Sequence, residues 1–252
     1  MSIAPNAPLG ATTPTSGDVL RQLRADTHAL TVRTDALGEE YGSVQTLSNN
    51  GYNSAHDAYE NANAATNPSI PSPASGPAIS VDVSTLSASQ PQLNTVCTTA
   101  VTDLEYCRGE VLRISTAVTN LAASMAPGPV ATALQTAVAN FSAGLNQQNN
   151  ISFDASASLQ DITQTLGTLS EEAAVISADT GAGVDASATA DQAQIDAQTL
   201  QNDYGEISNI AYPAGYSELS ASGYLHQAGA AMDQAITALP PDPSATPAPS
   251  GT

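Results

Sequence analysis

The 252-residue sequence contains no lysine and no tryptophan, and it has only two phenylalanines and two cysteines. Five arginines stand against 24 acidic residues, which gives a formal net charge of −19 at pH 7. Nucleic acids and anionic membranes are bound through clustered lysine and arginine, so neither is an expected partner. Only 12% of the residues are charged. The polar surface must therefore come mainly from serine, threonine, asparagine and glutamine.

Long apolar runs are also missing. No stretch approaches the roughly 20 apolar residues that a membrane-spanning helix needs. Residues 1–16 have neither the positive charge nor the apolar core of a secretory signal peptide. Any export is therefore expected to follow a non-classical route or to occur within a released particle, and the cellular location stays open. No cofactor is expected.

The sequence has heptad spacing instead, which predicts long helices. Between residues 18 and 65, seam positions recur in alternating steps of three and four, as they do in a coiled coil. Asp18 is the expected N-cap, and Gly38, Gly42 and Gly51 are expected to weaken this helix. The clearest seam positions are Leu20, Leu23, Thr27, Leu30, Thr34, Leu37, Tyr41 and Val44.

Proline-rich segments set the expected ends of the helices. Residues 66–90 contain four prolines, which predict a long connection with a strand-like stretch over 79–83. The Pro-Gly-Pro at 127–129 separates two further helices in the same way. Proline and glycine at 213–215 predict a turn before the last helix.

The predicted fold is all-α: an elongated helical bundle with coiled-coil-like packing and about five or six helices, several of them long. It is expected to form one domain over residues 17–239. A hinge is predicted at 180–184, where glycines interrupt the seam. The proline-rich ends, 1–16 and 240–252, are expected to be disordered.

Both cysteines lie on the most regular seam of the sequence. Cys97 and Cys107 are ten residues apart, which is about 15 Å along a helix, whereas a disulfide needs Cα atoms within about 7 Å. No further ligand at metal-binding spacing accompanies them, so they are interpreted as small buried apolar residues. A bond between two subunits is the alternative. The seam comprises Leu93, Cys97, Ala100, Leu104, Cys107, Val111, Ile114, Val118, Leu121 and Met125.

Tyrosine is the only abundant aromatic residue, with eight copies. Most of them fall in two sequence clusters beside glycines. Tyrosine suits interfaces, because its ring supplies contact area while its hydroxyl tolerates water. The alternative is that these residues only close the ends of the bundle. The predicted interface residues are Tyr41, Tyr52, Tyr59, Tyr204, Tyr212, Tyr216 and Tyr224.

The two tyrosine clusters share a local pattern. Residues 37–47 and 200–210 match at their apolar positions and at a Tyr-Gly pair, and a Gly-Tyr pair follows each segment. Two heptad seams match at apolar positions by chance, so only the tyrosine–glycine pairs carry information. Either an ancient duplication or equivalent docking roles in the two halves of the bundle would produce them.

No residue pattern typical of catalysis is present. The three histidines lack partners at metal-binding spacing, no phosphate-binding loop or nucleophile motif occurs, and adjacent acidic pairs such as Glu39 and Glu40 do not face each other on a helix. The sequence therefore predicts a non-enzymatic structural protein. Its expected role is a helical subunit that packs with itself or a protein partner in a virion, surface filament or secreted fibre. An exported helical effector or toxin and an intracellular scaffold or adaptor are the alternatives.

Overall fold

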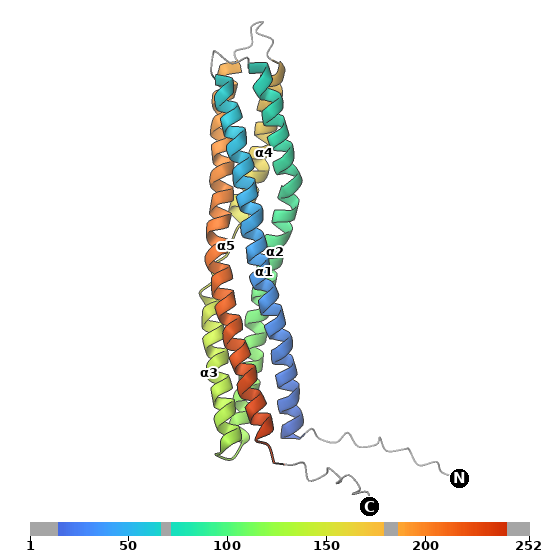
Figure 1. The fold of residues 1–252 in the computed structure, drawn as a ribbon, viewed down its shortest axis with the longest axis vertical. Coiled ribbons are helices and arrows are strands. Elements are labelled where there is room, and N and C mark those ends of the chain that lie inside the picture. Colours follow the sequence, from blue (N-terminus) through green and yellow to red (C-terminus); the bar gives the residue numbers. More distant parts are fainter. Residues whose placement is uncertain (1–14, 67–71, 179–185, 241–252) are drawn as a thin grey trace, which may run out of the picture.

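The computed structural model describes residues 15–66, 72–178 and 186–240, which form an elongated bundle of antiparallel helices (Figure 1). The predicted all-α fold is confirmed. At 1.5 Å per residue, the longest helices span about 75–80 Å. The described part of the chain folds into α1 (Ser16–Thr66), α2 (Ser72–Ser124), α3 (Pro129–Asn149), α4 (Ser156–Ala178) and α5 (Ala186–Thr237).

The helices form four columns. α1, α2 and α5 each run the length of the bundle, and α3 and α4 follow one another to make the fourth column (Figure 1). α1 packs against α2 and α5, and α3 and α4 pack against the same two helices from the opposite side. The arrangement is an up-down-up-down four-helix bundle whose third member is interrupted near its middle.

The first helix begins with a reciprocal cap. The Thr15 hydroxyl accepts a hydrogen bond from the Asp18 backbone N–H (3.2 Å), and the Asp18 carboxylate accepts one from the Thr15 backbone N–H (3.1 Å). This is the capping-box arrangement, in which two backbone donors at the helix start are satisfied together. The prediction that Asp18 is the N-cap is therefore wrong by three residues, because Thr15 caps the helix and Asp18 completes the box.

The predicted connection over 66–90 is also wrong for the most part. α2 begins at Ser72 and continues through Pro77 and Pro91. A proline inside a helix leaves the carbonyl four residues earlier without its donor. Pro91 and Ser87 both lie on the exposed face, so water can reach that carbonyl. The predicted strand-like stretch is helical instead and buries Ile79, Val83 and Leu86 in the core.

The predicted turn at 213–215 is wrong for the same reason. α5 runs through Pro213, and both Pro213 and Asn209, four residues earlier, are exposed. Because the helix is continuous, its seam keeps the same register beyond the proline. Glu218 consequently lies fully buried on that seam, while Leu219 is 63% exposed.

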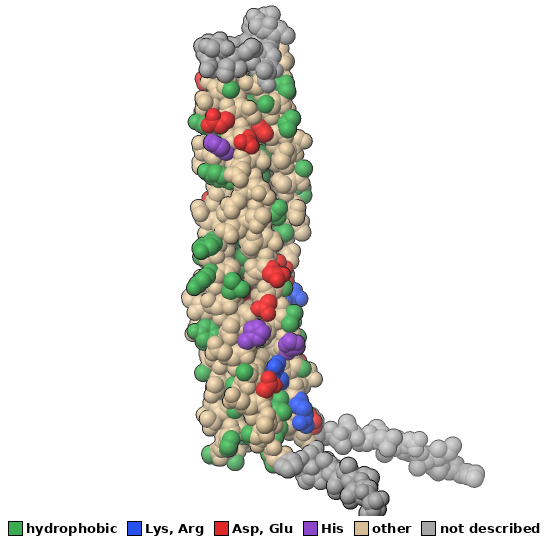
Figure 2. All heavy atoms as spheres, in the orientation of Figure 1, with side chains coloured by type: hydrophobic (Ala, Val, Ile, Leu, Met, Phe, Trp, Pro, Cys, Tyr) green, Lys and Arg blue, Asp and Glu red, His purple; other side chains and the backbone are tan. Residues whose placement is uncertain are grey.

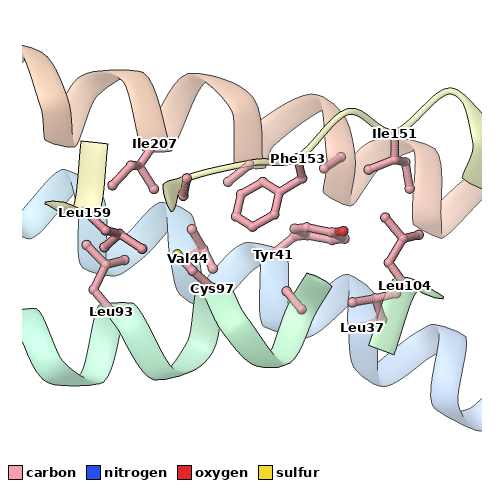
Figure 3. Packing of buried hydrophobic residues seen from close by; sticks show 14 of the residues in the cluster. Leu37, Tyr41, Val44, Leu93, Cys97, Leu104, Ile151, Phe153, Leu159 and Ile207 are labelled. Atoms are coloured by element: carbon pink, nitrogen blue, oxygen red, sulfur yellow. The ribbon is translucent and has the colours of Figure 1, made fainter. Parts of the chain in front are cut away.

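The interruption between α3 and α4 is an extended segment that still contributes to the core. Its residues alternate, with Ile151, Phe153 and Ala155 buried and Ser152 and Asp154 exposed. Figure 3 shows this segment passing between the helices, with the ring of Phe153 beside that of Tyr41 on α1. The two rings meet edge to face, with centroids 5.1 Å apart and planes at 76°.

Arg108 of α2 holds this segment in place. Its guanidinium donates to the carbonyl oxygens of Gln148 and Ile151, the latter at 2.9 Å. The first of these carbonyls belongs to the last turn of α3 and also accepts a hydrogen bond from the Ile151 backbone N–H (3.1 Å). On the other side of the break, the Asp154 carboxylate accepts hydrogen bonds from the backbone N–H and hydroxyl of Ser156 at the start of α4.

The regular seam of the sequence forms the core-facing side of α2. Figure 3 shows Leu93, Cys97 and Leu104 pointing toward side chains of α1, α4 and the extended segment. Small residues are buried toward the C-terminal end of α1 and the N-terminal end of α5, including Ala55, Ala58, Ala62, Ala190, Ala193 and Ala197. Of the predicted seam residues, Leu93, Cys97, Ala100, Leu104, Cys107, Val111, Ile114, Val118 and Leu121 are buried, and Met125 is partly buried.

The predicted hinge at 180–184, and residues 1–14 and 241–252 of the predicted disordered ends, lie outside the described residues. Within the described ranges, no helix combines the length and apolar character needed to cross a membrane.

Candidate functional site

Tyrosine and glycine pack reciprocally where α1 and α5 meet. Tyr204 of α5 lies against Gly51 of α1, so closely that a Cβ on Gly51 would come within 2.3 Å of the Tyr204 ring. Tyr41 of α1 lies against Gly215 of α5, where an added Cβ would be 3.2 Å from the Tyr41 Cβ. Since the two helices are antiparallel, each supplies one tyrosine and one glycine to the same contact.

This reciprocal contact gives a structural account of the similarity between the two tyrosine clusters. A tyrosine followed about ten residues later by a glycine is what each antiparallel helix needs to match the other. Tyr52 continues the pattern, lying 3.6 Å from the position that a Cβ on Gly205 would take. Equivalent docking roles are therefore sufficient to explain the shared pattern.

The outer side of the same contact is an open depression, here named the α1/α5 hollow. Its volume is about 180 Å³. Tyr212, Tyr216 and Leu219 rise beside it with 64%, 70% and 63% of their surfaces exposed. Gly42 lines it at an exposed position of α1, and no atom lies within 4 Å of the position that a Cβ on Gly42 would occupy. The hollow is lined by Gly38, Tyr41, Gly42, Gln45, Ala211, Tyr212, Gly215, Tyr216 and Leu219.

The lining of the α1/α5 hollow is entirely uncharged, although the chain carries a net charge of −19. Charged and polar cross-links lie on both sides of it along the helices. Toward one end, Ser222 donates to Asp35, whose other oxygen is 3.6 Å from His226 Nε2. Toward the other end, Ser208 donates to Asn49. Figure 2 shows small patches of hydrophobic side chains along the bundle, while charged side chains gather mainly in its lower half.

The structure separates the predicted interface tyrosines into different environments. Tyr41 and Tyr204 are 1% exposed core residues, so the interface interpretation is unsuited to them. Tyr224 is partly buried, and its Cβ lies 3.5 Å from the position of a Cβ on Gly144 of α3. The remaining four reach the surface: Tyr52, Tyr212 and Tyr216 are exposed, and Tyr59 is partly buried and stacks on His56.

All five arginines are engaged by acceptors of the chain itself. Four of them link different elements of the bundle, and one pairs within α1. Such cross-links use most of the scarce positive charge to fix the helices against one another. The pairs are Arg24 with Asp233, Arg33 with Asp103, Arg113 with Asp26, Arg108 with the Gln148 and Ile151 carbonyls, and Arg21 with Asp18.

A buried carboxyl group lies behind the hollow, and the sequence did not reveal it. Glu218 is fully buried, and one of its oxygens accepts a hydrogen bond from Gln148 Nε2 of α3 at 2.8 Å. Its other oxygen has no hydrogen-bond partner among the described residues. Burial raises the pKa of Glu218 to about 7, against the weaker opposing effects of Gln148 and Arg108.

A second depression, of about 470 Å³, lies between α2 and α4 beside the extended segment. Cys97, Phe153 and Leu159 form its apolar part, and amide and hydroxyl groups such as those of Asn94 and Thr163 surround them. The nearby Asp154 carboxylate is already used to cap α4. Among the described residues, no group of three or more His, Cys, Asp or Glu side chains is placed to hold a metal ion.

The two cysteines are free and buried. Burial raises the pKa of the Cys97 thiol to about 12 and that of the Cys107 thiol to about 11. The thiolate is the reactive form, and both groups are therefore protonated and shielded at neutral pH.

We expect neither thiol to react with a disulfide reagent such as DTNB in the native protein at pH 8, and both to react once the bundle is unfolded in urea. Absorbance of the released chromophore gives the number of thiols directly. Rapid stoichiometric labelling without denaturant would contradict the buried positions of Cys97 and Cys107.

In comparisons with known proteins, the chain matches no protein family, no curated protein and no solved structure.

Proposed function

We propose that this protein is a non-enzymatic structural subunit, a rigid helical rod that assembles with protein partners, foremost copies of itself, through the α1/α5 hollow. The observation that carries the proposal is the exposure of Tyr212, Tyr216 and Leu219 around an uncharged depression. Exposed apolar side chains that are grouped in this way mark interaction sites more often than isolated ones do.

The character of the bundle supports a structural role. α1, α2 and α5 have 51 to 53 residues each, several times the ~11–12-residue average of globular proteins. Arginine cross-links fix α1 to both of its neighbours. Such a rod presents a surface that is fixed along its length, as subunits of virions, surface filaments and secreted fibres require.

The experiment is a comparison of two charge insertions. Leu219→Asp places a carboxylate at the hollow, and Leu112→Asp places one on the exposed face of α2, where Leu112 is 58% exposed. Both variants have the same net charge, so a difference between them reports the position alone. We expect the wild type and Leu112→Asp to associate in sedimentation velocity as the protein concentration rises. Leu219→Asp should stay monomeric up to a concentration at least about tenfold higher than the one at which the wild type associates.

Circular dichroism of each variant verifies that the bundle is folded before association is compared. A wild-type protein that is strictly monomeric at all attainable concentrations, and that forms no filaments or rings in negative-stain electron microscopy, would refute self-assembly as its function.

A further inference from the structure

The α1/α5 hollow is lined by both an exposed aromatic ring and an exposed glycine. Tyr216 has 70% of its surface exposed, and Gly42 leaves bare backbone with open space where a side chain would be. Within the chain, the contact between α1 and α5 is already made by seating a tyrosine on a glycine, as Tyr204 does on Gly51. The exposed pair offers the same contact to another molecule.

We propose that the partner at this site is a second copy of the chain, packed face to face about a two-fold axis, with Tyr216 of each copy seated over Gly42 of the other. This inference rests on the proposed function and specifies its contact. A two-fold interface requires one surface to be complementary to itself. Tyr216 and Gly42 meet this requirement, because both line the same hollow.

Charge favours a second copy over a cationic partner. A basic protein would be recognised by acidic side chains, but the residues that line the hollow are all uncharged. Two copies with a net charge of −19 each repel one another, and an uncharged face is where they can approach most closely. Association between copies is therefore expected to strengthen as salt screens their charge, whereas binding of a cationic partner would weaken.

The nine residues that line the hollow are fewer than the ~20–30 residues that each partner contributes to a stable interface. The dimer is therefore expected to be of modest affinity unless neighbouring parts of the α1/α5 face join the contact. Tyr212 and Leu219, which flank Tyr216 along α5 and are similarly exposed, are the residues placed to extend it.

Covering the bare backbone at Gly42 tests the inference without disturbing the fold. Gly42→Leu adds a side chain that meets no atom of its own chain within 4 Å of the Cβ, and Gly109→Leu does the same on the exposed face of α2. We expect Gly42→Leu to weaken dimerisation in sedimentation velocity by about tenfold or more, and Gly109→Leu to behave as the wild type. Equal behaviour of the two variants would overturn the inference.

Mixing two defective variants gives a sharper test. Tyr216→Ala removes the exposed ring and leaves Gly42 bare, whereas Gly42→Leu covers that position and keeps the ring. In a mixed dimer, one contact is the native Tyr216–Gly42 pair. The other contact places the introduced alanine of one variant against the introduced leucine of the other. We expect each variant alone to dimerise poorly and the equimolar mixture to form heterodimers, identified by mass in native mass spectrometry.

The outcomes separate the inference from the proposed function. A wild-type chain that never associates removes both. A wild-type chain that associates while Gly42→Leu also associates normally, or while the mixture gives no heterodimer, removes only the two-fold contact, and assembly through another geometry or partner stands.

Discussion

Replacing Gly51 by alanine is expected to destabilise the bundle by about 2 to 3 kcal/mol, although alanine is the better helix former by about 1 kcal/mol. The added Cβ would lie 2.3 to 2.8 Å from three ring atoms of Tyr204, which is itself only 1% exposed. The ring must shift within a packed core to relieve this overlap. For a chain of this size the midpoint of thermal unfolding should fall by roughly 5 to 10 °C.

The same substitution at Gly109 provides the control. Gly109 is exposed in α2 and has no atom within 4 Å of the position of an added Cβ, so Gly109→Ala should raise stability by up to ~1 kcal/mol. If the change from glycine to alanine lowers the free energy of unfolding at position 51 and raises it at position 109, the difference reports the contact with Tyr204. A stabilising effect of Gly51→Ala would show that Tyr204 does not pack against this glycine.

Tyr204→Ala tests whether the two residues act on each other. Truncating this buried ring should destabilise the protein by about 3 to 5 kcal/mol, but it also removes the atoms that an alanine at position 51 would meet. In the double variant, Gly51→Ala should therefore lose its penalty. A coupling of at least about 1 kcal/mol between the two changes is expected from chemical denaturation.

The fold class could be predicted because heptad spacing places the apolar residues on one face of each helix, and that face is the one that is buried. The steps that identified Leu93, Cys97 and the other seam residues of α2 are the same steps that place them against the core. The chain repeats this signal over almost every helix. Local patterns and tertiary packing therefore agree, and the sequence can be interpreted without knowing which helix contacts which.

Prolines misled the prediction because their local preference was outweighed by packing. Pro77, Pro91 and Pro213 each remove one hydrogen bond and disfavour a helix by ~3 kcal/mol. The long seams of α2 and α5 bury enough apolar surface to offset this, and all three prolines lie on exposed faces. The useful signal was the register: continuing the α5 seam past Pro213 places Glu218 inside and Leu219 outside, as the structure does.

The candidate site could be predicted only in part. Tyrosines beside glycines indicated contacts, but sequence spacing does not say whether such a contact is made within the chain or presented to another molecule. Tyr41 faces the core and Tyr216 faces outward, although both belong to the same kind of motif. That distinction depends on how α1 and α5 are rotated against each other, which is a property of the assembled bundle.

Stability is expected to decrease as the pH rises from about 5 to 8, because several buried carboxyl groups must then ionise. Burial raises the pKa of Glu218 and of Glu172 to about 7, and that of Asp203 to about 6. A carboxyl whose pKa is higher in the folded state stabilises that state only while it is protonated. For Glu218 alone the stability lost between pH 5 and pH 8 amounts to about 2 to 3 kcal/mol.

Below about pH 4 the opposite effect sets in. Hydrogen bonding to Arg113 lowers the pKa of Asp26, and hydrogen bonding to Ser156 lowers that of Asp154. The stabilisation from these groups is present above their ordinary pKa values and is lost as the pH falls through the lowered ones. Stability should therefore be greatest near pH 5, which urea denaturation at a series of pH values would measure.

Glu218→Gln identifies the buried group behind this dependence. Arg108 and Cys107 of α2, Tyr41 of α1 and Gln148 of α3 interact with Glu218, and only Arg108 among them is cationic. A glutamine keeps the acceptor for Gln148 Nε2 but carries no charge at any pH. We expect it to raise the free energy of unfolding by about 2 to 3 kcal/mol at pH 8 and to change it by less than about 1 kcal/mol at pH 5.

Glu105→Gln, at an exposed position of α2, removes the same charge from the surface and should leave the pH dependence almost unchanged. The difference between these two variants separates the burial of one carboxylate from the general repulsion in a chain with a net charge of −19. If the two variants instead flatten the pH dependence equally, overall charge is the cause, and Glu218 has no special part in it. If Glu218→Gln destabilises at pH 8, the ionised carboxylate must be stabilised by a charged partner in the folded bundle, contrary to its single hydrogen bond from a neutral amide.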